Sequence, residues 1–200
     1  MLRMGLIVAA FASVGVGSAA SAQPGDEFDK LFAGTPWQII DGVETREIKL
    51  KGNVIVLQER VGGEIHTITE DRSGHGAVMC VLQYYLVLLA MNEICHINDD
   101  EIHSSLMSAV SRIGKFAERN SIEPVTQREI VDRAESVGAQ TLKQAVADNS
   151  LARLEQDCAD PQGFGGAFSE LRKMGAGKLI EEQVDVLLSV ERPAVDGPCY

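Results

Sequence analysis

Clusters of basic residues are scarce in this chain. Lysine and arginine number 18 against 29 aspartate and glutamate residues, which gives a formal net charge of −11 at pH 7. The longest basic run is Arg172-Lys173. Nucleic acids and anionic membrane surfaces both attract clustered Lys and Arg side chains. The composition therefore argues against a nucleic-acid partner and against binding to an anionic membrane surface.

Familiar catalytic motifs are missing as well. The chain contains no Cys-x-x-Cys pair, no Gly-x-Ser-x-Gly nucleophile elbow and no His-Glu-x-x-His zinc motif. The glycines and lysines of residues 173–179 lack the first glycine of a phosphate-binding loop and the hydroxyl residue after Lys178. These absences disfavour a thioredoxin-like redox centre, a zinc ribbon and a nucleotide-binding loop.

The first residues have the pattern of an export signal. Arg3 is the only charged residue among the first 25, residues 5–16 are apolar or small, and the Ala-Ser-Ala of residues 20–22 fits a cleavage site. The apolar run is shorter than the ~20 residues of a membrane-spanning helix. We therefore expect a cleavable signal peptide over residues 1–22 and a single periplasmic or secreted domain over residues 23–200.

Residues 36–71 follow the patterns of β-strands. Short segments that alternate apolar with charged residues are separated by turn dipeptides such as Asp41-Gly42 and Gly62-Gly63. The segment 54–61 begins apolar on both faces, which is typical of a central strand. We expect a three- to four-stranded antiparallel meander over about residues 36–71, within a mainly β part at residues 23–71.

Residues 77–190 follow helical patterns. Residues 77–94 are an almost unbroken apolar run, and the stretch before Asn92 is short for a bilayer. We expect a central helix buried on all sides, and no stable membrane span in the mature chain. A second helix is expected over residues 99–119, where apolar residues recur on one face.

Two helix starts carry capping patterns. Asn98 is expected as an N-cap, with Glu101 three residues later closing a capping box. The same pattern at Thr126 and Glu129 predicts another helix, continuing to about residue 148. In the C-terminal part of the chain we expect a loop at 160–166, helices near 167–174 and 178–189, and an extended tail over 191–200. The predicted fold class is α+β, a small antiparallel β-meander packed on a disulfide-tied helical bundle.

The four cysteines are Cys80, Cys95, Cys158 and Cys199, an even number that suggests two disulfides in an exported chain. If Cys80 and Cys95 share one helix, they lie about 22 Å apart at ~1.5 Å per residue. This exceeds the ~7 Å limit on the Cα separation of a disulfide, so they do not pair with each other. Of the two remaining connectivities, an up-down bundle favours Cys95–Cys158 with Cys80–Cys199.

The best metal-like cluster combines His96 and His103 with Asp99 and Asp100. Histidine and carboxylate ligands suit zinc or copper. The alternative is structural, because acidic residues also favour the first turn of a helix. We favour the structural role and expect no cofactor, with a zinc or copper site as the alternative.

Other candidate residues are histidines and aromatics. His75, between two glycines, is expected to be exposed and mobile, and His66 is the only histidine expected on a strand. Trp37 and the pair Tyr84 and Tyr85 are interpreted as core residues rather than as the lining of a ligand pocket.

The leading hypothesis is an exported, non-catalytic binding protein, such as an accessory subunit, adaptor or chaperone, that contacts an envelope or extracellular protein. A homodimer is left open. The alternative is a metal-binding or metal-dependent hydrolytic protein that uses His96, His103 and Asp99 or Asp100.

Overall fold

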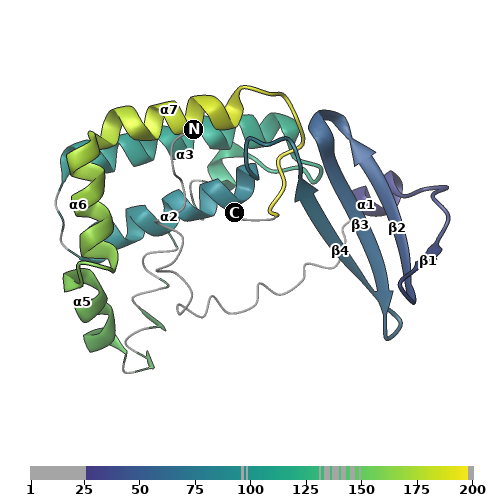
Figure 1. Cartoon of the computed structure of the whole chain (residues 1–200), viewed down its shortest axis with the longest axis horizontal. Helices are drawn as coiled ribbons and strands as arrows, with labels where there is room; N and C mark the ends of the chain where they lie inside the picture. Colours follow the sequence, from purple (N-terminus) through teal and green to yellow (C-terminus); the bar gives the residue numbers. More distant parts are fainter. Residues whose placement is uncertain are drawn as a thin grey trace.

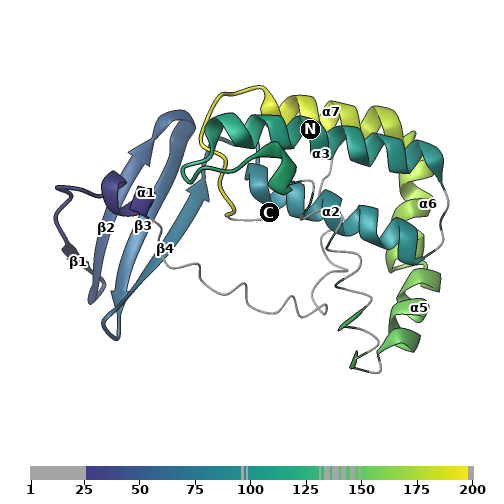
Figure 2. The same ribbon diagram turned by 180° about the vertical axis from the view of Figure 1, so that it is seen from behind.

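The computed structural model places a four-stranded sheet at one end of the molecule and helices at the other (Figures 1 and 2). It describes residues 26–95, 97, 99–130, 132, 136, 140, 143–144, 147–148 and 150–197. The predicted signal peptide, His96, Asn98 and Cys199 lie outside the described residues. The α+β fold predicted from the sequence is confirmed.

The sheet is an antiparallel meander in the order β1-β2-β3-β4. Its strands are β1 (Gln38–Ile40), β2 (Val43–Leu50), β3 (Val54–Val61) and β4 (Glu64–Asp71). Asp41 and Gly42 both have positive φ, as do Gly62 and Gly63. Two such residues make the turn whose twist matches antiparallel strands. Glu44 pairs with Arg60 in register, so both turns lie at the same end of the sheet, which we call the distal end.

One face of the sheet carries the N-terminal helix α1 (Asp26–Leu31), seen in front of the strands in Figure 2. Phe32, just after α1, is fully buried. The guanidinium carbon of Arg46 lies 4.7 Å from the ring centroid of Phe32 and 4.5 Å from that of Trp37. The guanidinium carbon of Arg60 lies 4.3 Å from the centroid of the Trp37 ring. Trp37 is therefore a packing residue held by cation–π contacts.

The helical part is built around α2 (Val78–Ile94), whose burial confirms the prediction of a central core helix. The other helices are α3 (Asp100–Asn120), α5 (Leu151–Ala159), α6 (Phe164–Met174) and α7 (Ala176–Leu188). In both views α3 and α7 run side by side along α2. Tyr85 of α2 is 2% exposed, and its hydroxyl donates to Gln183 of α7 over 3.1 Å. Within the described ranges, no helix has the length and apolar character that crossing a membrane requires.

The start of α3 corrects the predicted N-cap. Asp99, not Asn98, is the capping residue, and its carboxylate accepts from the backbone N–H of Ile102 at 3.1 Å. Both side chains can cap a helix, so the sequence alone left the register uncertain by one residue. The capping box at Thr126 and Glu129 is confirmed, because each residue's backbone N–H bonds to the other's side chain.

Helix α6 begins within the segment predicted as a loop. Phe164, Gly165 and Gly166 form its first turn instead of continuing the loop that ends α5. A Cβ at Gly166 would collide with the carbonyl oxygen of Pro161. These glycines allow α6 to start against the backbone of the preceding turn, and this close approach was mistaken for a signal of irregular structure.

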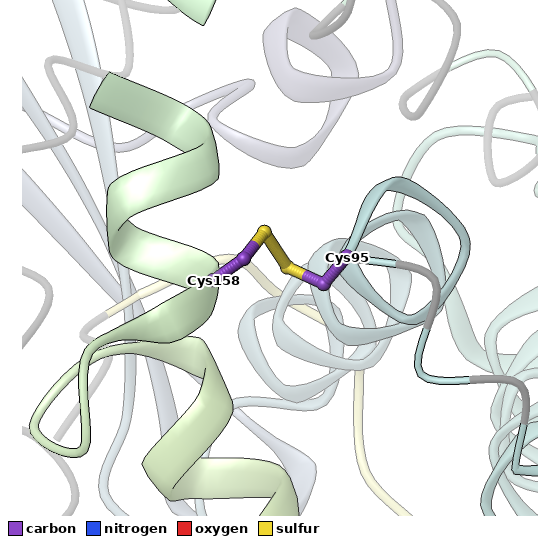
Figure 3. The surroundings of a disulfide bond; sticks show 2 residues. All are labelled: Cys95 and Cys158. Carbon is purple, nitrogen blue, oxygen red and sulfur yellow. A yellow bond between two sulfur atoms is a disulfide. The ribbon is translucent and has the colours of Figure 1, made fainter. Parts of the chain in front are cut away.

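The disulfide between Cys95 and Cys158 confirms one predicted bridge and ties the end of α2 to α5 (Figure 3). Their Cα atoms are 5.3 Å apart. The predicted partner of Cys80 is Cys199, which lies outside the described residues, so that pairing stays a prediction.

A buried ion pair joins the sheet to the helices. Arg192 is 1% exposed, and its Nε donates to Oδ2 of Asp71, at the end of β4, over 2.6 Å. The remaining guanidinium nitrogens donate to the carbonyl oxygens of Leu187, Val190 and Gly76. Because both charges are paired and hydrogen-bonded, they are tolerated in the interior.

Candidate functional site

Asp99, predicted as a metal ligand or as a structural acidic residue in the first turn of the helix, has a structural role as the N-cap of α3. Besides capping α3, its carboxylate accepts from Nε of Arg172 in α6 at 2.6 Å. The hydrogen bond from Arg172 is the main reason why the pKa of Asp99 lies below its ordinary value, and the Ile102 N–H lowers it further. This carboxylate thus links α3 to α6.

The remaining members of the predicted metal cluster are less constrained. Asp100 is exposed in the first turn of α3 and His103 is half-buried on the next turn, while His96 lies outside the described residues. Within the part of the chain that is described, no three His, Cys, Asp or Glu side chains form a group able to hold a metal ion. The metal interpretation stays a prediction. Elemental analysis of untagged protein, and of a His96→Ala/His103→Ala variant, tests it directly.

The other histidines are separated. His75 is half-buried rather than exposed, and its Nδ1 lies 3.1 Å from the carbonyl oxygen of Val186 and 3.3 Å from the hydroxyl of Ser189. The carbonyl oxygen of Val186 also accepts from the backbone N–H and the hydroxyl of Ser189, so the ring joins a small hydrogen-bonded group at the end of α7. His66 sits on β4 opposite Glu59. A general acid–base histidine needs an oriented partner beside a pocket. In the described part of the chain His75 contacts Val186 and Ser189 at the end of α7, whereas His66 pairs in register with Glu59 on the sheet, so the two histidines have separate surroundings.

The tyrosines belong to the core, as predicted. The rings of Tyr84 and Tyr85 are 6.0 Å apart, and burial raises the pKa of both hydroxyls. A cavity of about 520 Å³ opens on another side of α2, with Leu82, Leu86 and Ile130 among its lining residues. Its described lining contains no histidine or cysteine, but it includes the carboxylates of Glu123, Glu129 and Asp196 and the hydroxyls of Ser121 and Ser136.

The most unusual surface lies at the distal end of the sheet. Of the eight large apolar side chains that are exposed in the described residues, five lie on the sheet. We call them the distal sheet surface: Ile39 (78% exposed), Ile40 (48%), Val61 (51%), Ile65 (36%) and Ile68 (40%). By register, Ile40, Val61 and Ile68 share one face of the sheet and Ile39 and Ile65 the other; all but Ile68, which pairs with Leu57 in mid-strand, lie beside the two turns. Clustered exposed apolar groups of this kind mark interaction sites more often than single ones do.

Negative charge surrounds this surface. The five basic side chains between residues 36 and 72 each have a partner: Arg46 with Gln58, Lys49 with Glu47, Lys51 with Glu191, Arg60 with Glu44, and Arg72 with Glu70. Asp41, Glu59 and Glu64 form no salt bridge with a described Lys or Arg. The sheet therefore combines an apolar end with acidic side chains that no cation of the same sheet neutralises.

Sequence reasoning did not single out these residues. The alternation of apolar and charged residues predicted the strands. It did not predict which end of the sheet would extend beyond α1 and the other helices. The sequence did contain an indication of this exposure. Aliphatic residues adjoin both tight turns, and the turn end of a hairpin is the part that other elements cover least.

Fold and surface together define the class of the molecule: an α+β protein with a disulfide-tied helical part and an uncovered apolar end of its sheet. No protein-family model, curated protein sequence or solved structure matches the chain.

Proposed function

We propose that the chain is an exported, non-catalytic binding protein, an accessory subunit or adaptor, that contacts a protein partner through the distal sheet surface. The observation that carries the proposal is that five of the eight exposed large apolar side chains of the described residues lie on the sheet, with Ile40, Val61 and Ile68 on one face. Exposed apolar side chains on the helices are isolated by comparison, at Leu151, Met174 and Val186. Burial of apolar area is the main driving force of most protein association.

Two further features support this proposal. The N-terminal pattern and the disulfide both suit an oxidising compartment outside the cytosol. β4 is an edge strand, and edge strands readily accept another chain. Together they suggest an envelope or extracellular protein as the partner.

Site-specific photo-cross-linking tests the proposal. A photoreactive amino acid at Val61 or Ile68, in protein expressed with its full N-terminus in its own cell, should give one defined adduct of constant mass. The same probe at Met174 or Val186, which are similarly exposed on helices, is the matched control and should give none. An Ile40→Lys substitution should remove the adduct, because it places a charge within the apolar surface.

The outcomes separate the alternatives. An adduct of twice the chain's mass would identify a homodimer in place of a different partner. Equal labelling from the sheet and helix positions would refute a specific surface. N-terminal sequencing of the processed protein should give Gln23 as the first residue; a chain that retains residues 1–22 would contradict the export part of the proposal.

A further inference from the structure

We propose that the partner binds as an extended strand along the outer edge of β4, which no described strand pairs with, placing an aliphatic side chain opposite Ile68 and basic side chains opposite His66 and Glu64. This inference rests on the proposed function and specifies how the partner would be recognised. Strand addition uses backbone hydrogen bonds for affinity and alternate side chains for specificity.

The direction of the backbone groups on β4 follows from one hydrogen bond. The N–H of Asp71 donates outward, to the carbonyl oxygen of Gly197, over 2.8 Å. Backbone groups of an antiparallel strand point to alternate sides. The N–H and C=O of Ile65 and Thr67 therefore also point outward from the sheet, whereas those of Glu64, His66 and Ile68 face β3.

The chain itself already uses part of this edge. Gly197 approaches so closely that a Cβ on it would lie 2.6 Å from the carbonyl oxygen of Thr69. The edge thus accepts an extended segment at the end nearest the helices, around Asp71. The stretch from Glu64 to Ile68 runs on toward the distal turn, away from the helices in both views (Figures 1 and 2).

Side chains beside this edge define the chemistry of the incoming strand. Ile68 is 40% exposed and lies next to the half-buried Leu57 in register, so an aliphatic residue opposite it would bury apolar area. Two and four residues away on the same face, His66 lies beside Glu59, and Glu64 adjoins Val61. Glu59 and Glu64 form no salt bridge with a described basic side chain. A cross-strand pair of opposite charge favours Lys or Arg opposite Glu64. The carboxylate of Glu59 lies one strand further in, beside His66, where a long basic side chain opposite His66 would reach toward it.

The inference is tested with the full processed chain and a synthetic peptide, acetyl-Thr-Val-Thr-Lys-Thr-Lys-Thr-amide. Residue-resolved hydrogen exchange should show slower exchange at the amides of Ile65 and Thr67 in the presence of the peptide. The amides of Glu64, His66 and Ile68 should not change, because they already bond to β3. A peptide with Glu in place of both Lys residues should bind about tenfold more weakly.

Two kinds of variant test the backbone pairing and the side-chain recognition separately. Ile65→Pro removes an outward N–H without removing a bond to β3, and should abolish binding of the lysine peptide. Ile65→Thr keeps that N–H and should bind within about threefold of the original chain. The double variant Glu59→Lys/Glu64→Lys changes only side chains and should reverse the preference between the lysine and glutamate peptides.

Two results would overturn the inference: unchanged exchange at Ile65 and Thr67 with saturating peptide, or full binding by Ile65→Pro. If the photo-cross-link from Val61 still forms in either case, a partner binds the distal sheet surface by another geometry. If that cross-link is also absent, the proposed function fails with it.

Discussion

The sheet and the helical part are stabilised by interactions of very different sequence range. All strand pairings lie within residues 38–71, and each strand is joined to the next by a short connection. The helices instead depend on distant partners: Cys95 with Cys158, 63 residues apart, and Tyr85 with Gln183, 98 residues apart. Their surfaces differ too, since exposed aliphatic side chains gather on the sheet and are scattered on the helices.

This contrast indicates a division of roles. A meander closed by local turns forms without waiting for the rest of the chain, because its loop-closure cost is small. The helical part gains its stability from long-range links and contains most of the buried core. We infer that the helices supply stability and the sheet supplies the binding surface. Each of the following changes tests this division of roles.

Loss of the buried guanidinium should have the largest effect. Arg192→Met leaves the carboxylate of Asp71 buried without its partner, and we expect a loss of up to about 5 kcal/mol in the free energy of unfolding. The combined variant Asp71→Asn/Arg192→Met should recover part of this loss. Urea unfolding of both variants measures it, and equal stability of the two would show that the charge of Asp71 is unimportant.

Removal of the disulfide should act on the helices alone. In the chain-entropy model a bridge across 63 residues contributes about 4 kcal/mol, so Cys95→Ala/Cys158→Ala should lose a comparable amount. Hydrogen exchange should then accelerate in α2 and α5 while β2 and β3 keep their protection. If the sheet exchanged equally fast, the two regions would unfold as one unit.

A methyl group at the start of α6 should cost less. Gly166→Ala forces a Cβ against the carbonyl oxygen of Pro161, and we expect a loss of about 1–3 kcal/mol. Gly177→Ala in α7 is the control, because its Cβ would meet only side-chain atoms of Ser105 and Glu101. Thermal unfolding should rank Gly177→Ala well above Gly166→Ala in stability.

The Asp99–Arg172 pair should contribute a smaller, pH-dependent amount. Asp99→Ala removes the cap of α3 and should cost about 1 kcal/mol, whereas Asp99→Asn keeps the cap and loses only the charge. Because the pKa of Asp99 is lowered by folding, its charge stabilises the protein above the unfolded value of 3.8. This contribution should disappear as the pH falls through the lower, folded pKa. Urea unfolding should therefore show a larger difference in stability between the original chain and Asp99→Asn at pH 7 than at pH 3.

Changes on the distal sheet surface should have the smallest effect on stability. Val61→Thr and Ile68→Thr keep β-branched side chains on exposed strand positions, so the free energy of unfolding should change by no more than about 0.5 kcal/mol. Cross-linking to the partner should nevertheless weaken. A large loss of stability would mean that these residues serve the core and not an interface.

Local patterns allowed much of the fold to be predicted. The limits of β3 follow from turn residues on either side, and the burial of α2 follows from a run with almost no polar residue. The Cys95–Cys158 pairing could be predicted because helix length excludes Cys80 as a partner of Cys95, and an up-down order of the helices favours Cys158 over Cys199.

Features that depend on two distant segments could not be predicted. Nothing near Arg192 in the sequence indicates a buried residue, since its charge is tolerated only because Asp71 and three carbonyl oxygens surround it. The exposure of the distal aliphatic residues likewise depends on how far α1 and the other helices extend over the sheet. Asp99 was named as a candidate, but its role follows from Arg172, on a helix 73 residues later.

The pairing of Asp71 with Arg192 also sets an order of events during synthesis. The two residues are 121 positions apart, so at the usual ~5–20 residues per second the ribosome needs on the order of 10 s to supply the second after the first. During that interval the finished meander carries an unneutralised carboxylate at the place where the helices will dock. The nascent chain thus remains open between its two halves until late in translation.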